Sequence, residues 1–275
     1  MRLLRGHVGA LREAGFLLTR HHELTFEMAR REVSDRYAGQ AFGILWAVGH
    51  PIFMTGLYVF VFAVVFKAKI GGTFELPLDY TTYILSGLIP WMAFQDSMNR
   101  SCTAVTANAS LVKQVVFPLE VLPAKGVIAS LLPQFISTII LITYVLVVHR
   151  RLLATYALLP ILVFLQILAM LGAAYLLSAV GAYFRDIKDL VQLFCIAGVY
   201  LVPVVYLPDW TPRMFRPVLY LNPFSYPVWC YQDALYFGRF EHPWAWAVNG
   251  FLSISMFVSG YRVFRKLKPG FGNAL

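Results

Sequence analysis

Several stretches of about twenty apolar residues, separated by clusters of charged side chains, run along this chain. About twenty apolar residues are what an α-helix needs to cross the hydrocarbon core of a bilayer. Charged residues make up only 13% of the chain, too few to cover a water-facing surface, since a globular protein carries roughly twice that share. The sequence therefore predicts an all-α integral membrane protein.

The apolar stretches predict six transmembrane helices, over 41–66, 79–100, 124–148, 152–183, 190–206 and 244–264. Six crossings place both termini on one side, which then holds 16 of the 23 basic residues. Because cytoplasmic segments carry the excess of Lys and Arg, both termini are expected in the cytoplasm. The formal charge of +9 mostly reflects this asymmetry and contact with anionic lipid, so nucleic acid is not an expected partner.

Two local features of the predicted spans are expected to be structural. Ala174, Ser178 and Ala182 repeat every four residues, which predicts a small-residue ridge that lets another helix approach closely. Asp96 and Arg100 are four residues apart with the acid first, the spacing of a local ion pair on one helix face.

The motifs of catalytic and cofactor sites are missing from the sequence. It contains no phosphate-binding loop and no zinc-hydrolase or serine-hydrolase signature, and the spans lack the acid–base chains of ion-coupled carriers. Cys102, Cys195 and Cys230 are scattered and odd in number, so they suggest neither a disulfide framework nor a metal site. No secretory signal peptide, metal or cofactor is expected, and energy for uphill transport would have to come from another polypeptide.

Two cytoplasmic segments are expected to lie outside the spans. Residues 1–40 are polar, and Glu23 to Tyr37 mixes apolar and charged positions, which predicts a helix along the inner membrane interface. Residues 108–123, here called the coupling segment, connect the second and third spans. They carry an apolar group of Leu111, Val112, Val115, Val116 and Phe117. Exposed apolar groups mark partner surfaces, so a second polypeptide is expected to dock there.

The outer segment, residues 207–243, contains six prolines and ten aromatic residues. A simple extracellular loop would not be this apolar. Such a composition predicts short re-entrant helices that dip into the outer leaflet, with backbone breaks buried in protein or lining a cavity.

Short motifs of glycine, proline, aromatic and charged residues occur from about residue 20 to the end of the chain. They are Arg36-Tyr37, Gly43, Trp46, Pro51, Leu88-Ile89-Pro90-Trp91, Phe94, Asn108, Leu111-Val112-Lys113, Phe117 to Pro123, Tyr183 to Ile187, and Asn222-Pro223. In this order and spacing they resemble the membrane subunit of type-2 ABC exporters. More narrowly, the chain resembles the permeases that export lipid-linked O-antigen, capsular polysaccharide or teichoic acid.

The resemblance implies a role for each segment outside the spans. The coupling segment would contact a separate ATPase subunit through Leu111, Val112, Lys113, Phe117, Pro118 and Glu120. The interface helix would meet the pyrophosphate of a polyprenyl carrier through Arg30, Arg31 and Arg36, because the guanidinium fork suits phosphate. The outer gate would involve Trp210, Asn222, Pro223 and Trp229. One departure is Gln232-Asp233, where members often carry an arginine before the acid, which weakens a charge-pair role for Asp233.

A sugar path needs surfaces that bind pyranose faces weakly and repeatedly, as aromatic rings do. The candidates are Trp46, Phe53, Tyr58 and Phe62 on the first span with Tyr200 and Tyr206 on the fifth.

We therefore expect a transport subunit of the bacterial inner membrane that forms a homodimer and works with two copies of an ATP-binding subunit. ATP and Mg²⁺ would bind the partner, and six spans are too few to enclose a polymer-sized path without a closed two-fold dimer. The alternatives are a type-2 exporter of drugs or small lipids, a membrane enzyme acting on polyprenyl-linked glycans, and a passive channel.

Overall fold

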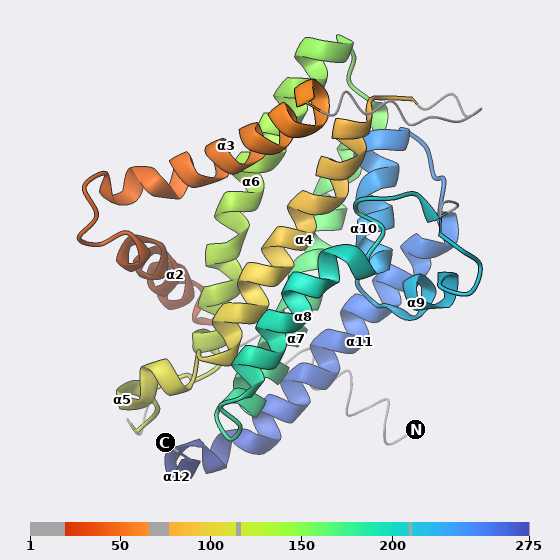
Figure 1. The fold of residues 1–275 in the computed structure, drawn as a ribbon. Helices are drawn as coiled ribbons and strands as arrows, with labels where there is room; N and C mark the ends of the chain where they lie inside the picture. Colours follow the sequence, from red (N-terminus) through yellow and green to blue (C-terminus); the bar gives the residue numbers. More distant parts are fainter. Residues whose placement is uncertain (1–19, 66–76, 114–116, 209–210, 275) are drawn as a thin grey trace.

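A computed structural model describes residues 20–65, 77–113, 117–208 and 211–274. These residues form helices and contain no strand, which confirms the all-α class (Figure 1). The α-helices are α2 His22–Arg36, α3 Trp46–Val59, α4 Tyr80–Cys102, α5 Ala109–Val112, α6 Val121–His149, α7 Leu159–Gly181, α8 Ile187–Leu201, α9 Arg216–Leu221, α10 Ser225–Gln232, α11 Pro243–Leu267 and α12 Phe271–Ala274. Short 3₁₀ or π turns are η1 Gly43–Leu45, η2 Phe60–Val65, η3 Thr106–Asn108, η4 Ala154–Leu158, η6 Asp233–Phe237 and η7 Lys268–Gly270.

Three helical stretches in the described part of the chain are long and apolar enough to cross a membrane. They are Gly43–Val64, Val121–His149 and Ala154–Gly181, and they match the predicted first, third and fourth spans. The other three predicted spans overlap α4, α8 and α11, but these helices do not combine the length and apolarity needed to cross a membrane. Six crossings therefore stay a prediction.

The helix α4 is less apolar because it lies inside the bundle. Every residue from Thr81 to Trp91 is buried, so its hydroxyl groups face protein and not lipid. The helix α8 differs in length: its 15 residues span about 22 Å, less than the ~30 Å of a hydrocarbon core.

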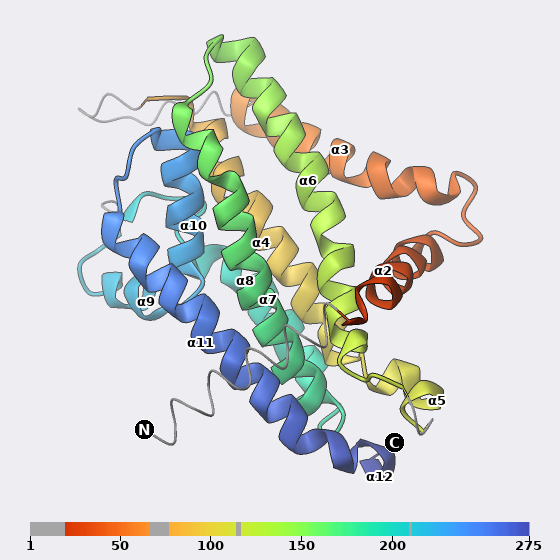
Figure 2. The same ribbon diagram turned by 180° about the vertical axis from the view of Figure 1, so that it is seen from behind.

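The closest helix packing in the bundle joins α7 and α11, which lie side by side in Figure 2. A side chain at Gly172 would overlap the backbone of Met256, and one at Gly260 would overlap the carbonyl of Gly172. A side chain at Gly181 would overlap the carbonyl of Cys102 at the end of α4. The predicted ridge, which runs along the last part of α7 to its C-cap Ala182, is buried, and the closest approaches fall on glycines beside it.

The helices α2 and α3 stand apart from the bundle and contact it mainly through α6 (Figure 1). The buried residues of α2 are Thr25 and Ala29. On α3, the Thr55 hydroxyl donates to the Ser137 hydroxyl at 2.9 Å. Most other side chains of both helices are exposed, so this arm has apolar surface that the chain itself leaves uncovered.

The outer segment contains two short helices, α9 and α10, followed by the π turn η6. Residues 227–236 are all buried, so the change from α to π backbone occurs inside protein. Asp233 accepts hydrogen bonds from the backbone N–H and Nδ1 of His242 and from Nε1 of Trp246, at 2.9 to 3.0 Å. This buried carboxylate is held by ring nitrogens and one amide.

Candidate functional site

One end of the bundle, here called the α5 end, gathers segments that are far apart in sequence. There α4, α7 and α11 end and α6 and α8 begin, with α5 and α12 beside them (Figure 1). Residues 23–37, where an interface helix is predicted, largely coincide with α2, which packs on the first part of α6 near this end.

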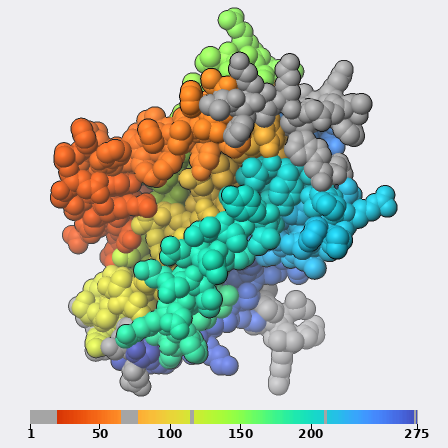
Figure 3. Space-filling model, viewed as in Figure 1, coloured from red at the N-terminus to blue at the C-terminus, as the bar shows by residue number. Residues whose placement is uncertain are grey.

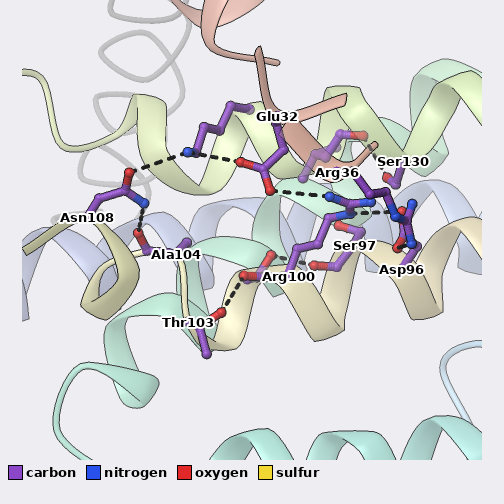
Figure 4. A network of polar contacts seen from close by, with 12 residues as sticks. Glu32, Arg36, Asp96, Ser97, Arg100, Thr103, Ala104, Asn108 and Ser130 are labelled. Carbon is purple, nitrogen blue, oxygen red and sulfur yellow. Dashed lines mark hydrogen bonds and ion pairs between the residues drawn. The ribbon is translucent and has the colours of Figure 1, made fainter. Parts of the chain in front are cut away.

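A network of ion pairs links α2 to α4 and α6 at this end (Figure 4). Glu32 accepts from Nη1 of Arg100 at 3.2 Å and from Nζ of Lys125 at 3.0 Å. Asp96 accepts from Nε of Arg100 at 2.9 Å, which confirms the predicted local pair, and from Nη2 of Arg36 at 3.4 Å. The side chains of Glu32, Asp96, Arg100 and Lys125 are each less than a third exposed. Their ion pairs are therefore better shielded from water than surface salt bridges.

The network continues into the start of the coupling segment. Nζ of Lys125 also donates to Oδ1 of Asn108 at 3.5 Å, and Nδ2 of Asn108 donates to the carbonyl of Ala104 at 2.8 Å. A cavity of about 140 Å³ adjoins these groups and is lined by both Glu32 and Asn108. Charge-assisted hydrogen bonds therefore connect the interface helix to the coupling segment.

The residues predicted to contact an ATPase differ in their exposure. Lys113 is exposed, Leu111, Phe117 and Pro118 are half-buried, and Val112 and Glu120 are buried. Val115 and Val116 lie outside the described residues. The side chain of Glu120 faces inward, where both carboxylate oxygens accept from Nζ of Lys268 at 2.7 and 2.9 Å.

The three arginines predicted to bind pyrophosphate lie on α2. Arg30 and Arg31 are exposed, and Arg30 lies 4.0 Å from Glu27 on the same exposed face. Arg36 is also exposed, but its guanidinium is shared with Asp96. Only Arg30 and Arg31 of the three therefore lie outside the ion-pair network.

A cavity of about 280 Å³ lies next to Arg36, between α3, α4 and α6. The surface in Figure 3 is hollowed there, between the α2–α3 arm and α8. Its polar lining consists of Arg36, His50, Thr55, Gln95, Asp96, Asn99, Ser130, Gln134 and Ser137. At its inner end, Gln134 and Gln166 exchange hydrogen bonds at 2.8 and 3.0 Å. Polar side chains thus line this cavity from the α5 end into the helix bundle.

The predicted path residues do not line this cavity in the described part of the chain. Phe53 and Tyr200 are 65% and 68% exposed, and Trp46 is exposed as well. Tyr58 and Phe62 stack on each other, with ring centroids 6.4 Å apart.

The aromatic contacts of Tyr58 on α3 and Phe62 on η2 continue onto α4, away from the α5 end. The ring of Phe62 lies 6.1 Å from that of Tyr80, and Tyr80 stacks on Tyr83. The Tyr83 hydroxyl donates to the carbonyl of Tyr206 at 3.1 Å. The structure thus connects Tyr58, Phe62 and Tyr206 through neighbours that the sequence did not indicate.

Of the predicted outer-gate residues, Trp210 lies outside the described residues. Asn222 ends α9 and bridges two backbones: its Nδ2 donates to the carbonyl of Leu201, and its Oδ1 accepts from the N–H of Phe224, each at 3.0 Å. Pro223 is exposed. Trp229 is fully buried and stacks on His242 with ring centroids 5.5 Å apart.

Sequence reasoning missed Glu32, Lys125 and Lys268. Glu32 stands four residues before Arg36, the spacing of a helix pair, but it binds cations of α4 and α6. Spacing within one helix therefore does not reveal the partners of Glu32.

The sequence matches the family described as ABC-2 type transporter over residues 23–236. The chain therefore belongs to this family of membrane transport subunits, as the motifs predicted. It is 27% identical over 258 residues to the O-antigen export system permease protein RfbA of Klebsiella pneumoniae, covering 92% of this chain and 95% of that protein. It is 26% identical to a Myxococcus xanthus protein of the same name, covering 80% and 82%. The polysialic acid transport protein KpsM of Escherichia coli is 21% identical, covering 74% and 78%.

Proposed function

We propose that this chain is the membrane-spanning subunit of an ATP-driven exporter of a polysaccharide carried on polyprenyl pyrophosphate. The observation that carries the proposal is the end-to-end similarity to O-antigen export permeases, over 92% of this chain and 95% of the relative. The polysialic acid transport relative supports the same substrate class, a long glycan.

The proposed topology has six crossings in the bacterial inner membrane, with both termini in the cytoplasm and the α5 end inside. The buried α4 crosses within protein, whereas the short α8 has large exposed apolar side chains on its outer face. Two copies form a closed dimer, and each engages one ATPase chain that binds ATP and Mg²⁺. The uncovered apolar surface of α3 supports a partner copy or lipid on that side.

The proposed ATPase contact is made by the exposed Lys113 together with the half-buried Leu111, Phe117 and Pro118 of the coupling segment. Val112 and Glu120 support this surface from inside. The Lys113 ammonium among apolar side chains would fit an apolar groove of the ATPase that has a carboxylate at its rim.

The proposed route of the substrate begins at α2. Arg30 and Arg31 are exposed and bind the pyrophosphate, and the polar cavity beside Arg36 receives the first sugars. The aromatic residues Trp46, Phe53, Tyr58, Phe62, Tyr200 and Tyr206 offer stacking surfaces, and Asn222, Pro223 and Trp229 belong to the outer gate with Trp210.

The experiment is deletion of this subunit in a cell that makes a lipid-linked surface glycan, followed by complementation. We expect the glycan to accumulate inside on its lipid carrier and to return to the surface with the wild-type chain. The matched pair is Lys113→Glu, which should abolish rescue, and Lys266→Glu, the same charge change at another exposed position, which should not.

Each alternative predicts a different result. Changed drug sensitivity with normal surface glycan would identify a drug exporter. Turnover of lipid-linked glycan by the purified chain alone would identify an enzyme, and export without ATP would identify a channel.

A further inference from the structure

The end of the coupling segment is tied to the end of α11 by a partly buried ion pair. Glu120 and Lys268 are 148 residues apart in sequence, yet Nζ of Lys268 contacts both carboxylate oxygens at 2.7 and 2.9 Å. The side chain of Glu120 is 8% exposed and that of Lys268 33%. A pair this shielded is costly to break, because the remaining carboxylate would stay buried without its cation.

Glu120 is also held from a second helix and is not used as a helix cap. It precedes the first turn of α6, but its side chain makes no capping hydrogen bond there. The Tyr175 hydroxyl of α7 donates to its backbone carbonyl at 3.3 Å. The Glu120 carboxylate therefore pairs with Lys268, and the Glu120 backbone is hydrogen-bonded to α7.

The residues after Lys268 continue the contact with the coupling segment. The ring of Phe271 is fully buried, 5.4 Å from the ring of Phe264 and 6.1 Å from that of Tyr183. The Tyr183 hydroxyl donates to the carbonyl of Leu267 at 3.1 Å. The helix α12, which starts at Phe271, packs against α5. Residues 268–274 thus contact both ends of the described coupling segment.

We propose that residues 268–274 form a strut that sets the position of the coupling segment relative to α11, with Lys268 as a positioning residue for energy coupling. The strut rests on the proposed function in that the coupling segment is the surface that meets the ATPase. The ion-pair network holds the start of the segment at Asn108, and Lys268 holds its end at Glu120. A displacement of the coupling segment by the ATPase is therefore passed to α2 through Asn108 at its start, and to α11 through Glu120 at its end and through the contact of α12 with α5.

The first test measures the chain by itself. In lipid nanodiscs, hydrogen–deuterium exchange of residues 109–113 should become about tenfold faster in Lys268→Gln and in Lys268→Glu, as expected for loss of a local tether. The exchanged pair, Glu120→Lys with Lys268→Glu, should slow it again. The control Lys266→Glu should leave it unchanged, and size-exclusion profiles establish that each variant is folded. Unchanged exchange in both Lys268 variants would overturn the strut.

The second test measures coupling in the complex with the ATPase. Glycan exported per ATP hydrolysed should fall about tenfold in Lys268→Gln, a size typical of coupling between sites, while ATPase binding persists. The exchanged pair should recover most of the loss. Faster exchange with unaltered export per ATP would overturn the positioning role. A wild-type complex that exports no glycan would refute the proposed function. The hydrogen–deuterium exchange measurement would still test the strut in that case.

Discussion

Glu32 balances two cations of the ion-pair network at the α5 end. Its two oxygens accept from cations of α4 and α6, at 3.2 and 3.0 Å. Removing this carboxylate leaves Arg100 and Lys125 with fewer acceptors in a half-buried position, and hydrogen bonds to charged groups are the costly ones to lose. Glu27, on the same helix, is 62% exposed and meets only Arg30 at 4.0 Å among the pairs of the described residues.

We therefore expect Glu32→Gln to lower the stability of the purified chain by about 1–3 kcal/mol, and Glu27→Gln to change it by less than about 0.5 kcal/mol. The measurement is thermal unfolding in detergent, followed by tryptophan fluorescence. Equal effects at the two positions would show that the network contributes nothing to the fold.

The helix pair α7–α11 shows how a membrane bundle is held without a hydrophobic driving force between helices. Gly172 and Gly260 let the backbones meet, and a methyl group at either position would overlap backbone atoms of the other helix. Backbone cannot rotate away as a side chain can, so the helices would have to separate. Gly250, also on α11, has open space around the position of a side chain.

Gly260→Ala should accordingly destabilise the chain by about 1–3 kcal/mol, the usual cost of overpacking, whereas Gly250→Ala should be neutral or slightly stabilising because alanine favours helix. Unfolding temperatures and the yield of monodisperse protein give the comparison. A tolerated Gly260→Ala would mean that α7 and α11 do not approach this closely.

The long elements could be predicted from the sequence, and most of the contacts between them could not. Long apolar runs predict α6 and α7, because a helix that crosses a bilayer needs apolar side chains along its whole length. The α5 end depends instead on pairs such as Glu120 with Lys268, whose partners are 148 residues apart. No local spacing encodes such a pair, since its two residues meet only where the end of α11 lies beside the start of α6. The pair of Asp96 and Arg100 could be predicted because it lies within one helix.

The whole molecule has a compact bundle and an outlying arm of α2 and α3, connected through α6 and the ion-pair network (Figure 1). Large apolar side chains remain exposed on α3 and on α8, among them Phe53, Ile196 and Tyr200. Lipid covers such surface in a monomer, and a second copy covers part of it in a dimer. The proposed homodimer has two coupling segments, so it makes a quantitative prediction that a monomer does not.

Wild-type chain and the double variant Leu111→Asp with Lys113→Glu, first shown to be inactive alone, can be expressed together in equal amounts. If dimers form at random and both coupling segments are needed, about one quarter of the dimers stay active, and export should fall to that level. Independent monomers, or dimers in which one coupling segment suffices for its own half, would retain about half. Surface glycan measured against the ratio of two differently tagged chains distinguishes a quadratic from a linear dependence. A linear dependence would contradict the need for two coupled copies, while leaving the contact of each coupling segment with its ATPase intact.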